Sequence, residues 1–348
     1  LQEQSFTVSS ARIINAAQIP SSPSAPKTER LVAFASIFGF MLAAGYIAIR
    51  EAFDDRLRVE RDVREKLGME YIGGLPSIKA QKSLRDRMKG EPAPAPREIR
   101  FPEIERYAAD NPLSPYAEVI RSTRMATSIR LIGKKTQTNR PSEAPCIAIG
   151  FVSCFPNEGK TTTSSNVANL LAKQGKRVML IDGDLRNPGL TRSLKGDVEK
   201  GFVDILTEDA DWRDMYYTDP ELGTHVLPSR STQVFHTSEL LQSDQMIALM
   251  SDLRNHYDYI IVDLPPLGPV IDARAILPLI DGLVFVAKWG ETRIKQVRSI
   301  LRQDERLRSQ SFGLILNMYD PKKARGYGDD EMGAYYYGEG YNRYYQTR

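Results

Sequence analysis

The stretch that decides the fold is 147–162, which reads IAIGFVSCFPNEGKTT. Its first seven residues, Ile147–Ser153, are mostly apolar and favour a buried strand. A Gly-Lys-Thr loop follows, and 161–174 then has helical periodicity up to Gly175, a residue type that often ends helices. Strand, loop and helix in this order are the context of a phosphate-binding loop (P-loop), whose backbone N–H groups face phosphate oxygens.

The loop predicts a nucleotide site for ATP and Mg²⁺. We expect Lys160 to reach the β- and γ-phosphate oxygens and the Thr161 hydroxyl to ligate the metal. Cys154 stands where the usual pattern has its first glycine, so the flanking strand and helix carry the assignment. Asn317 ends a later apolar run and is expected to contact the base, although asparagine is also a common structural choice there. The predicted nucleotide contacts are Pro156, Asn157, Glu158, Gly159, Lys160, Thr161, Thr162 and Asn317.

Aspartates end two further apolar runs. VMLIDGD carries Asp182 and Asp184, and YDYIIVDLPP carries Asp263. A single aspartate at a strand end is often only a turn former. Three of them, at the ends of strands that alternate with helix-length segments, predict side chains that converge on one crevice, because parallel strands place their carboxyl ends at one edge. We expect Thr161, Asp184 and Asp263 to hold the metal.

The rest of the chain continues this alternation. Helices are expected over Glu239–Arg254 and Arg293–Arg308, and strands over Leu283–Ala287 and Phe312–Asn317. The fold class is therefore α/β, a P-loop NTPase with a mostly parallel sheet flanked by helices.

An uncharged run of nineteen residues, Leu31–Ile49, predicts one transmembrane helix. As a helix it would be about 28 Å long, close to the hydrocarbon thickness of a bilayer. Basic residues are more frequent just after this run than just before it, which places the C-terminal part in the cytoplasm. They are Arg50, Arg56, Arg58, Arg61, Arg64 and Lys66 after the run, against Lys27 and Arg30 before it.

The segments around the span are expected to connect it to neighbouring parts. A charged helix is predicted from Arg50 to about Gly68, and a flexible tether over Pro76–Arg97. The chain begins with Leu1, so we expect a preceding part to be missing. The expected division is the end of a periplasmic domain with a Pro-rich linker (1–30), a transmembrane helix (31–49), a cytoplasmic juxtamembrane segment and linker (50–112), the P-loop domain (113–320) and a disordered, Tyr-rich tail (321–348).

Composition narrows the possible functions. A net charge of +3 over 348 residues does not favour nucleic acid as a partner. Cys146 and Cys154 bracket one predicted strand, too far apart for a disulfide, so reduced thiols are expected. His225, His236 and His256 lack the spacing of a metal site.

Seven tyrosines lie among polar residues at the C-terminus, where few aliphatic side chains could bury them. A phenol can accept a phosphoryl group, so the chain could carry its own substrate; a merely sticky low-complexity tail is the alternative. The candidate acceptors are Tyr327, Tyr335, Tyr336, Tyr337, Tyr341, Tyr344 and Tyr345.

Together these motifs resemble the bacterial protein-tyrosine kinases of polysaccharide co-polymerases. The resemblance covers essentially the whole chain, including the Pro-rich segment before the span, the single span and the tail. It implies an oligomeric ring that phosphorylates its own tail tyrosines in trans, with a tyrosine phosphatase and the polysaccharide polymerisation and export machinery as partners, at the bacterial inner membrane. The matching residues are Ser153, Pro156, Glu158, Gly159, Lys160 and Thr161 in the loop, Asp182, Asp184 and Arg186 in the second motif, Asp263 and Pro266 in the third, and Glu118, Arg121 and Arg124 in the ring-contact motif.

The expected reaction is phosphoryl transfer from ATP to tyrosine, with Lys160, Asp182 and Asp184 as catalytic residues. Asp182 is favoured as the base for the phenol proton, and Asp184 as a metal or positioning residue, although the sequence does not separate them. The main alternative is a partitioning-type, membrane-associated P-loop ATPase without a protein substrate. Such proteins typically carry a lysine early in the loop, where this chain has Phe155. An inert membrane scaffold is the third possibility.

Overall fold

The computed structural model describes residues 25–78, 94–135, 146–208, 210–230, 236–324 and 327, and the chain divides into two compact units, Leu1–Asp54 and Asp55–Arg348. In the first unit, helix α1 (Thr28–Ala52) contains the predicted span. Its stretch Thr28–Glu51 is long and apolar enough to cross a membrane, and none of its most apolar part is buried.

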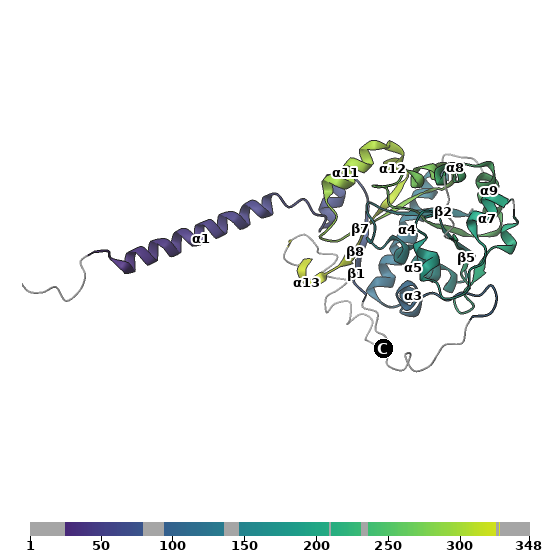
Figure 1. Cartoon of the computed structure of the whole chain (residues 1–348), viewed down its shortest axis with the longest axis horizontal. Helices are drawn as coiled ribbons and strands as arrows, with labels where there is room; N and C mark the ends of the chain where they lie inside the picture. Colours follow the sequence, from purple (N-terminus) through teal and green to yellow (C-terminus); the bar gives the residue numbers. More distant parts are fainter. Residues whose placement is uncertain are drawn as a thin grey trace, which may run out of the picture. The chain divides into compact units, whose positions relative to one another are not determined.

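In the second unit, the described residues form an eight-stranded sheet in the order β1-β8-β7-β2-β6-β3-β5-β4 (Figure 1). Every neighbouring pair is parallel except β4 and β5, which are antiparallel. The predicted α/β class with a mostly parallel sheet is confirmed. The strands are β1 (Tyr71–Pro76), β2 (Ile147–Ser153), β3 (Val178–Asp182), β4 (Tyr217–Thr218), β5 (His225–Leu227), β6 (Tyr259–Asp263), β7 (Gly282–Lys288) and β8 (Ser311–Tyr319).

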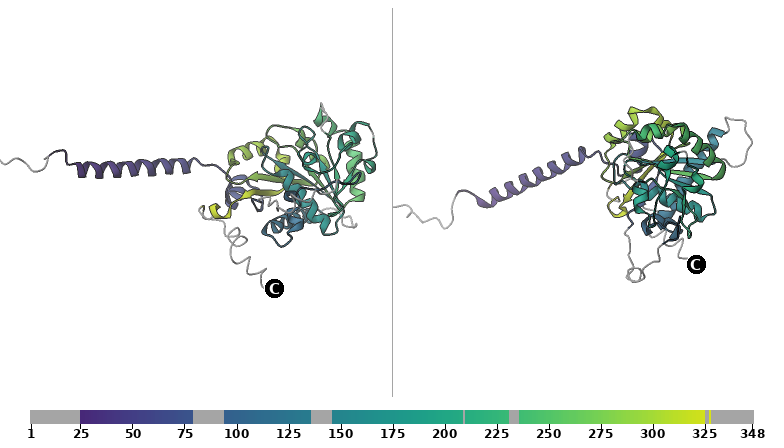
Figure 2. Two further views of the ribbon diagram at one scale, coloured as in Figure 1. Left: turned by 60° about the horizontal axis from the view of Figure 1, so that its bottom comes forward. Right: turned by 45° about the vertical axis from the view of Figure 1, so that its right-hand side comes forward.

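Helices cover both faces of this sheet (Figures 1 and 2). The longer ones are α3 (Glu103–Asp110), α4 (Pro115–Lys135), α5 (Lys160–Lys173), α9 (Asp244–His256) and α11 (Ile294–Gln303). The shorter ones are η1 (Asp62–Leu67), α6 (Gly189–Ser193), α7 (Phe202–Glu208), η2 (Trp212–Asp214), α8 (Thr237–Leu240), α10 (Asp272–Ala275), η3 (Leu277–Leu279), α12 (Glu305–Ser309) and α13 (Pro321–Ala324).

Strand β2 shows how the two layers arise. Alternate residues of a strand point to opposite faces, so Ala148 and Val152 join one buried cluster and Ile149 and Phe151 join the other. The first cluster includes side chains of α7, α9 and α11, and the second includes side chains of α3, α4 and α5. Because both faces are covered, the central strands are apolar throughout, as in other buried parallel sheets.

Two predicted helices are each divided in the structure. Within Glu239–Arg254, helix α8 ends at Leu240, and Ser243 then caps α9 by accepting a hydrogen bond from the backbone N–H of Met246 at 3.2 Å. Within Arg293–Arg308, Asp304 separates α11 from α12 and accepts the N–H of Arg306 at 3.0 Å. The prediction of continuous helices was wrong because the capping side chains favour a new helix start over continuation.

The juxtamembrane segment also differs from its prediction. The helix expected from Arg50 to about Gly68 is interrupted: α1 ends at Ala52, and helical structure returns only in the short η1, Asp62–Leu67. Residues 55–57 then lie along the turn that follows β7: Ile294 N–H donates to Asp55 O at 2.7 Å, Leu57 N–H donates to Thr292 O at 2.9 Å, and Gly290 N–H donates to Leu57 O at 2.8 Å. The Leu57 side chain is fully buried, and apolar contacts of this kind outweigh the helical charge pattern.

The expected linker 50–112 therefore contributes structure to the folded unit. It contains β1, an edge strand paired with β8, and α3, which packs against α5. Most of the predicted tether, residues 79–93, lies outside the described residues, as do Pro20–Ser24 of the Pro-rich linker.

Candidate active site

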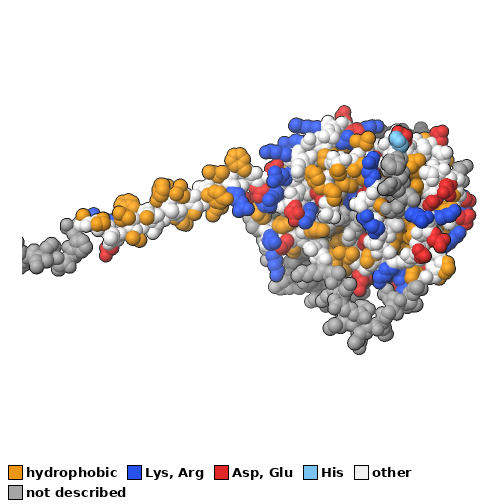
Figure 3. Space-filling view, in the orientation of Figure 1, with side chains coloured by type: hydrophobic (Ala, Val, Ile, Leu, Met, Phe, Trp, Pro, Cys, Tyr) orange, Lys and Arg blue, Asp and Glu red, His pale blue; other side chains and the backbone are white. Residues whose placement is uncertain are grey.

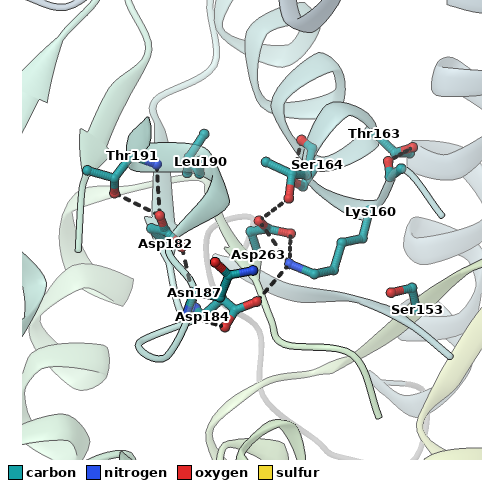
Figure 4. A network of polar contacts seen from close by, with 12 residues as sticks. Ser153, Lys160, Thr163, Ser164, Asp182, Asp184, Asn187, Leu190, Thr191 and Asp263 are labelled. Atoms are coloured by element: carbon teal, nitrogen blue, oxygen red, sulfur yellow. Dashed lines mark hydrogen bonds and ion pairs between the residues drawn. The ribbon is translucent and has the colours of Figure 1, made fainter. Parts of the chain in front are cut away.

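The candidate site lies at the carboxyl edge of three neighbouring strands, β2, β6 and β3. Lys160 is the first residue of α5, and its ammonium group lies 3.3 Å from both carboxylate oxygens of Asp263 and 3.4 Å from Asp184 Oδ2 (Figure 4). Thr161 Oγ1 donates to Asp263 Oδ2 at 2.6 Å. Burial opposes the charged form of Lys160, but the surrounding carboxylates of Asp263 and Asp184 outweigh it and raise its pKa. This ammonium group therefore stays positive near neutral pH.

Asp182 faces away from this cluster, toward Thr191 of α6 (Figure 4). Its Oδ2 accepts hydrogen bonds from Thr191 N–H at 2.8 Å and from Thr191 Oγ1 at 2.7 Å. Its Oδ1 has only a long contact, 3.4 Å, with the N–H of Asp184. Burial, and next the charge of Asp263, raise the pKa of Asp182 to about 7. Asp182 is thus a buried carboxyl group that can exchange a proton near neutral pH.

The P-loop between β2 and α5 adopts an unusual backbone. Asn157 has φ 64° and Gly159 has φ 92°, both in the left-handed region. A Cβ atom on Gly159 would lie 1.9 Å from Asn317 Nδ2, so this position has no room for a side chain. Asn317 Nδ2 donates to Glu158 O at 2.9 Å, which ties the loop to the end of β8. Asn317 therefore lies against the loop backbone; its expected contact with the base stays a prediction.

The oxygen donors around Lys160 suit a hard divalent cation. Thr161 Oγ1 and the carboxylates of Asp263 and Asp184 are the available groups. Within the described ranges no group of three or more His, Cys, Asp or Glu side chains could hold a metal by itself. This combination fits Mg²⁺, which keeps several waters and is usually bound by one or two protein carboxylates together with substrate phosphates.

A buried acid next to the site was not predicted from the sequence. Glu105 of α3 accepts a hydrogen bond from Ser193 Oγ at 3.0 Å, and burial together with the charges of Asp263 and Asp182 raises its pKa to about 7. Sequence reasoning missed it because a glutamate in a short charged helix gives no signal of burial. Thr191, nine residues after Asp182, was missed for the same lack of local pattern.

Arg186, the last residue of the second motif, pairs with Asp272 of α10. Its Nε lies 2.8 Å from Asp272 Oδ2, which also accepts Thr237 Oγ1 at 2.6 Å. This buried carboxylate joins the loop after β3 to α8 and α10. The motif pointed to Arg186, whereas its partners are distant in the sequence and carried no signal.

The predicted ring-contact residues lie on α4. Glu118 and Arg121 form an ion pair, and Arg124 is exposed, with its Nη1 3.3 Å from Gln174 Oε1. Two large apolar side chains of the same helix, Met125 and Ile129, are 65% and 60% exposed. This part of α4 thus combines charged groups with exposed apolar area, a composition found at subunit contacts.

Of the predicted acceptor tyrosines, only Tyr327 lies within the described residues. It is 38% exposed, and the guanidinium carbon of Arg58 lies 4.3 Å from its ring centroid. The others, Tyr335, Tyr336, Tyr337, Tyr341, Tyr344 and Tyr345, lie outside them. Cys146 and Cys154 are free thiols, as predicted.

Comparison with known sequences places this site among related proteins. The family described as an AAA domain matches residues 157–304, from the P-loop to the end of α11. The tyrosine-protein kinase CpsD of Streptococcus agalactiae is 34% identical over 182 residues, which cover 52% of this chain and 79% of that protein.

Longer relatives match almost the whole chain. The succinoglycan biosynthesis transport protein ExoP of Rhizobium meliloti is 34% identical over 354 residues, covering 99% of this chain and 44% of ExoP. The putative tyrosine-protein kinase EpsB of Ralstonia solanacearum is 26% identical and covered to 41%. The chain thus spans about two-fifths of the length of these relatives.

Among solved structures, the kinase domain of the Escherichia coli tyrosine kinase ETK superposes with a TM-score of 0.58 at 25% identity, over 76% of this chain and 95% of that domain. The chimerical protein CapA2B2 gives the same TM-score at 21% identity and shows the shared fold.

Proposed function

Because the chain belongs to the family of bacterial tyrosine-protein kinases that includes CpsD, we propose that it transfers the γ-phosphoryl group of ATP to tyrosine hydroxyls of its own C-terminal segment. One observation carries the proposal: Lys160, Thr161, Asp184 and Asp263 converge within hydrogen-bonding or ion-pair distance at the strand ends. Seven tyrosines of the same chain supply candidate acceptors. The names of the relatives favour a kinase over a partitioning-type ATPase.

Each residue of the site has a separate role in phosphoryl transfer, a reaction that depends mainly on positioning and charge stabilisation. Lys160 binds the β- and γ-phosphate oxygens. Thr161 and Asp263, with Asp184 beside them, would hold Mg²⁺, which when bound would neutralise charge on the transferred group. The loop backbone from Asn157 to Thr162 receives the phosphates at the N-terminus of α5.

We assign the acceptance of the phenol proton to Asp182. A tyrosine hydroxyl has a pKa near 10, so its proton must leave during transfer. A carboxylate with a pKa of about 7 is a better acceptor at neutral pH than an ordinary one. Thr191 donates only to Oδ2, and we assign the incoming hydroxyl to Oδ1, whose contact with Asp184 N–H is long.

The same proposal covers location and assembly. Helix α1 would span the bacterial inner membrane, with the α/β unit in the cytoplasm. Glu118, Arg121 and Arg124 would contact a neighbouring subunit in a ring, so that one tail enters the next site. The cycle of phosphorylation, completed by a tyrosine phosphatase, would control polymerisation or export of an exopolysaccharide or capsule. The name of one relative, a succinoglycan biosynthesis transport protein, supports the link to a polysaccharide.

One experiment separates the three candidate functions. The full chain in detergent is incubated with γ-labelled ATP and Mg²⁺, and the tail is then analysed by mass spectrometry. A kinase gives phosphotyrosine among Tyr327–Tyr345. Free phosphate with an unmodified tail identifies an ATPase, and neither product identifies a scaffold.

The assembly has its own test. Replacing Glu118, Arg121 and Arg124 together by Ala is expected to give a species that sediments as a monomer, because the charged part of the contact is lost. An unchanged oligomer after this triple substitution would refute the assigned contact.

A further inference from the structure

The P-loop holds two residues in the left-handed region of backbone conformation. Asn157 is a non-glycine residue with φ 64°, and Gly159 has φ 92°. Residues in this region persist only where surrounding contacts over-determine them. The contacts that do this here come mainly from one side chain of the loop, Glu158.

The Glu158 carboxylate turns back onto the loop. Its Oε2 accepts the backbone N–H of Cys154 at 2.7 Å and of Phe155 at 2.8 Å. Its Oε1 accepts a hydrogen bond from the hydroxyl of Thr292. The residue is only 4% exposed, so the carboxylate connects the beginning and the end of the loop inside the protein.

Thr292 fixes this arrangement from outside the loop. It lies in the turn between β7 and α11 and is buried. Its hydroxyl oxygen accepts the N–H of Lys288 at 2.9 Å, so its single hydrogen is available for Glu158. The main chain of Glu158 is held separately by Asn317, whose own carbonyl accepts the N–H of Trp289 at 2.9 Å. The strand ends of β7 and β8 thus hold Glu158 at two points.

A carboxylate is an unexpected group in a loop that receives a polyanion. Facing the phosphates, it would repel them. Three hydrogen-bond donors direct this one away, and each bond to a charged acceptor is stronger than one between neutral groups. The hydrogen bonds of the Glu158 carboxylate therefore stabilise the loop and do not serve to bind the nucleotide.

We propose that Glu158 and Thr292 are positioning residues: their carboxylate–hydroxyl pair sets the P-loop in its phosphate-receiving shape in advance. The inference rests on the proposed nucleotide site and adds Thr292, which no sequence motif includes. It also changes the expected role of Glu158: the residue supports the loop instead of contacting the nucleotide.

The matched pair Thr292→Val and Thr292→Ser tests the hydroxyl. Valine has the same shape without the hydroxyl, so it removes both the donor to Glu158 and the acceptor for Lys288 N–H, whereas serine keeps both. In the full chain without nucleotide, hydrogen exchange of the Cys154 and Phe155 amides should be faster by about fivefold or more in Thr292→Val, since a lost hydrogen bond loosens the carboxylate. Thr292→Ser should exchange like the natural chain.

Nucleotide binding supplies the second readout. Thr292→Val should weaken Mg·ADP binding and raise KM for ATP by about tenfold, with a smaller change in kcat, because shaping the loop contributes to ground-state binding. Glu158→Ala should weaken binding at least as much, and Glu158→Gln, which keeps an acceptor for the two amides, should fall between. Thermal unfolding of each variant identifies a general loss of stability.

The outcomes are distinct. Unchanged amide exchange and unchanged Mg·ADP affinity in Thr292→Val overturn the inference, as does equal weakening in Thr292→Val and Thr292→Ser. If Thr292→Val fails to fold, equal binding by Glu158→Ala and the natural chain overturns it. If the natural chain binds Mg·ADP but labels no tyrosine, the proposed kinase function fails while the exchange result still decides this inference.

Discussion

Two helices of this chain depart from the usual distribution, in which apolar side chains are buried and polar side chains are exposed. Helix α1 is apolar and exposed: Phe34 and Phe40 are 73% and 75% exposed, and apolar side chains appear along its whole length in Figure 3. Helix α5 is polar and buried: Ser164, Asn166 and Asn169 have no exposed surface. Both arrangements would be unfavourable if side chains were judged by type alone.

The difference lies in what surrounds each helix. The buried asparagines of α5 are satisfied by the backbone of α3: Asn166 Oδ1 accepts Ala108 N–H at 2.8 Å, and Asn166 Nδ2 donates to Ile104 O at 2.8 Å. Asn169 Nδ2 donates to Glu105 O at 3.0 Å. The apolar side chains of α1 are exposed in the structure, and the proposed bilayer would supply an apolar solvent for them.

The largest expected effect is at the first residue of α5. Lys160→Met removes the ammonium group that holds the phosphates and leaves Asp263 and Asp184 without their counter-charge. Tyrosine phosphorylation should fall by about a thousandfold, the scale for losing a charge-stabilising group. Labelled ATP measures it, with the exposed Lys173→Met at the other end of α5 as the control. Equal activity in the two variants would contradict the assigned site.

A smaller effect is expected in the middle of α5. Asn166→Ala removes three hydrogen bonds, to Ala108 N–H, Ile104 O and Thr162 O, and the first two of these join α5 to α3. The free energy of unfolding should fall by about 4 kcal/mol. Urea denaturation measures this, and Asn255→Ala, at an exposed position of α9, should cost less than about 0.5 kcal/mol. Similar losses in both variants would mean that α5 does not depend on its polar contacts.

The site was predictable where its signals are local. The strand bounds Ile147–Ser153 match β2, and Asp263, at the end of its apolar run, meets Lys160 as parallel topology requires. The prediction of continuous helices missed the starts at Ser243 and Asp304, although both are favoured capping residues and so carried a local signal.

Other parts depend on partners far away in the sequence. Strand β1 contains two glycines and has little apolar alternation, and its pairing with β8 defines it. The burial of Glu105 depends on α5 and on Ser193. The orientation of Asp182 depends on Thr191, across a turn. Long-range contacts of this kind leave no periodicity in a single sequence.

A third prediction tests the other helix. Phe40→Arg places a charge near the middle of the apolar run, and its insertion into a bilayer should become less favourable by about 3 kcal/mol. Carbonate extraction of cell membranes should then release more of the chain. Phe53→Arg, just after α1, is the control and should leave extraction unchanged. Denaturation of the α/β unit should be the same in both variants, since the two helices lie in separate compact units.

The smallest expected effect is on the pH dependence of stability, and it comes from Glu105, a buried titratable residue of α3 beside α5. The pKa of Glu105 is about 7 in the folded chain, above the ordinary value of 4.5, so the folded state binds this proton more tightly than the unfolded state. Its contribution is therefore favourable at low pH and is lost as the pH rises from about 4.5 to 7. Between pH 5 and pH 8 this loss is about 2 kcal/mol. Burial is its main cause; the hydrogen bond from Ser193 reduces it, and the carboxylates of Asp263 and Asp182 increase it.

Glu105→Gln removes this titration while its amide oxygen can still accept the Ser193 hydroxyl. The variant should be more stable than the natural chain at pH 8 and differ less from it at pH 5, in urea denaturation at both values. Glu103→Gln, at the exposed start of α3, should leave the pH dependence unchanged. If Glu105→Gln keeps the full pH dependence, the charge is stabilised in place, and the contacts between α3 and α5 tolerate an ionised carboxylate as well as they tolerate neutral amides.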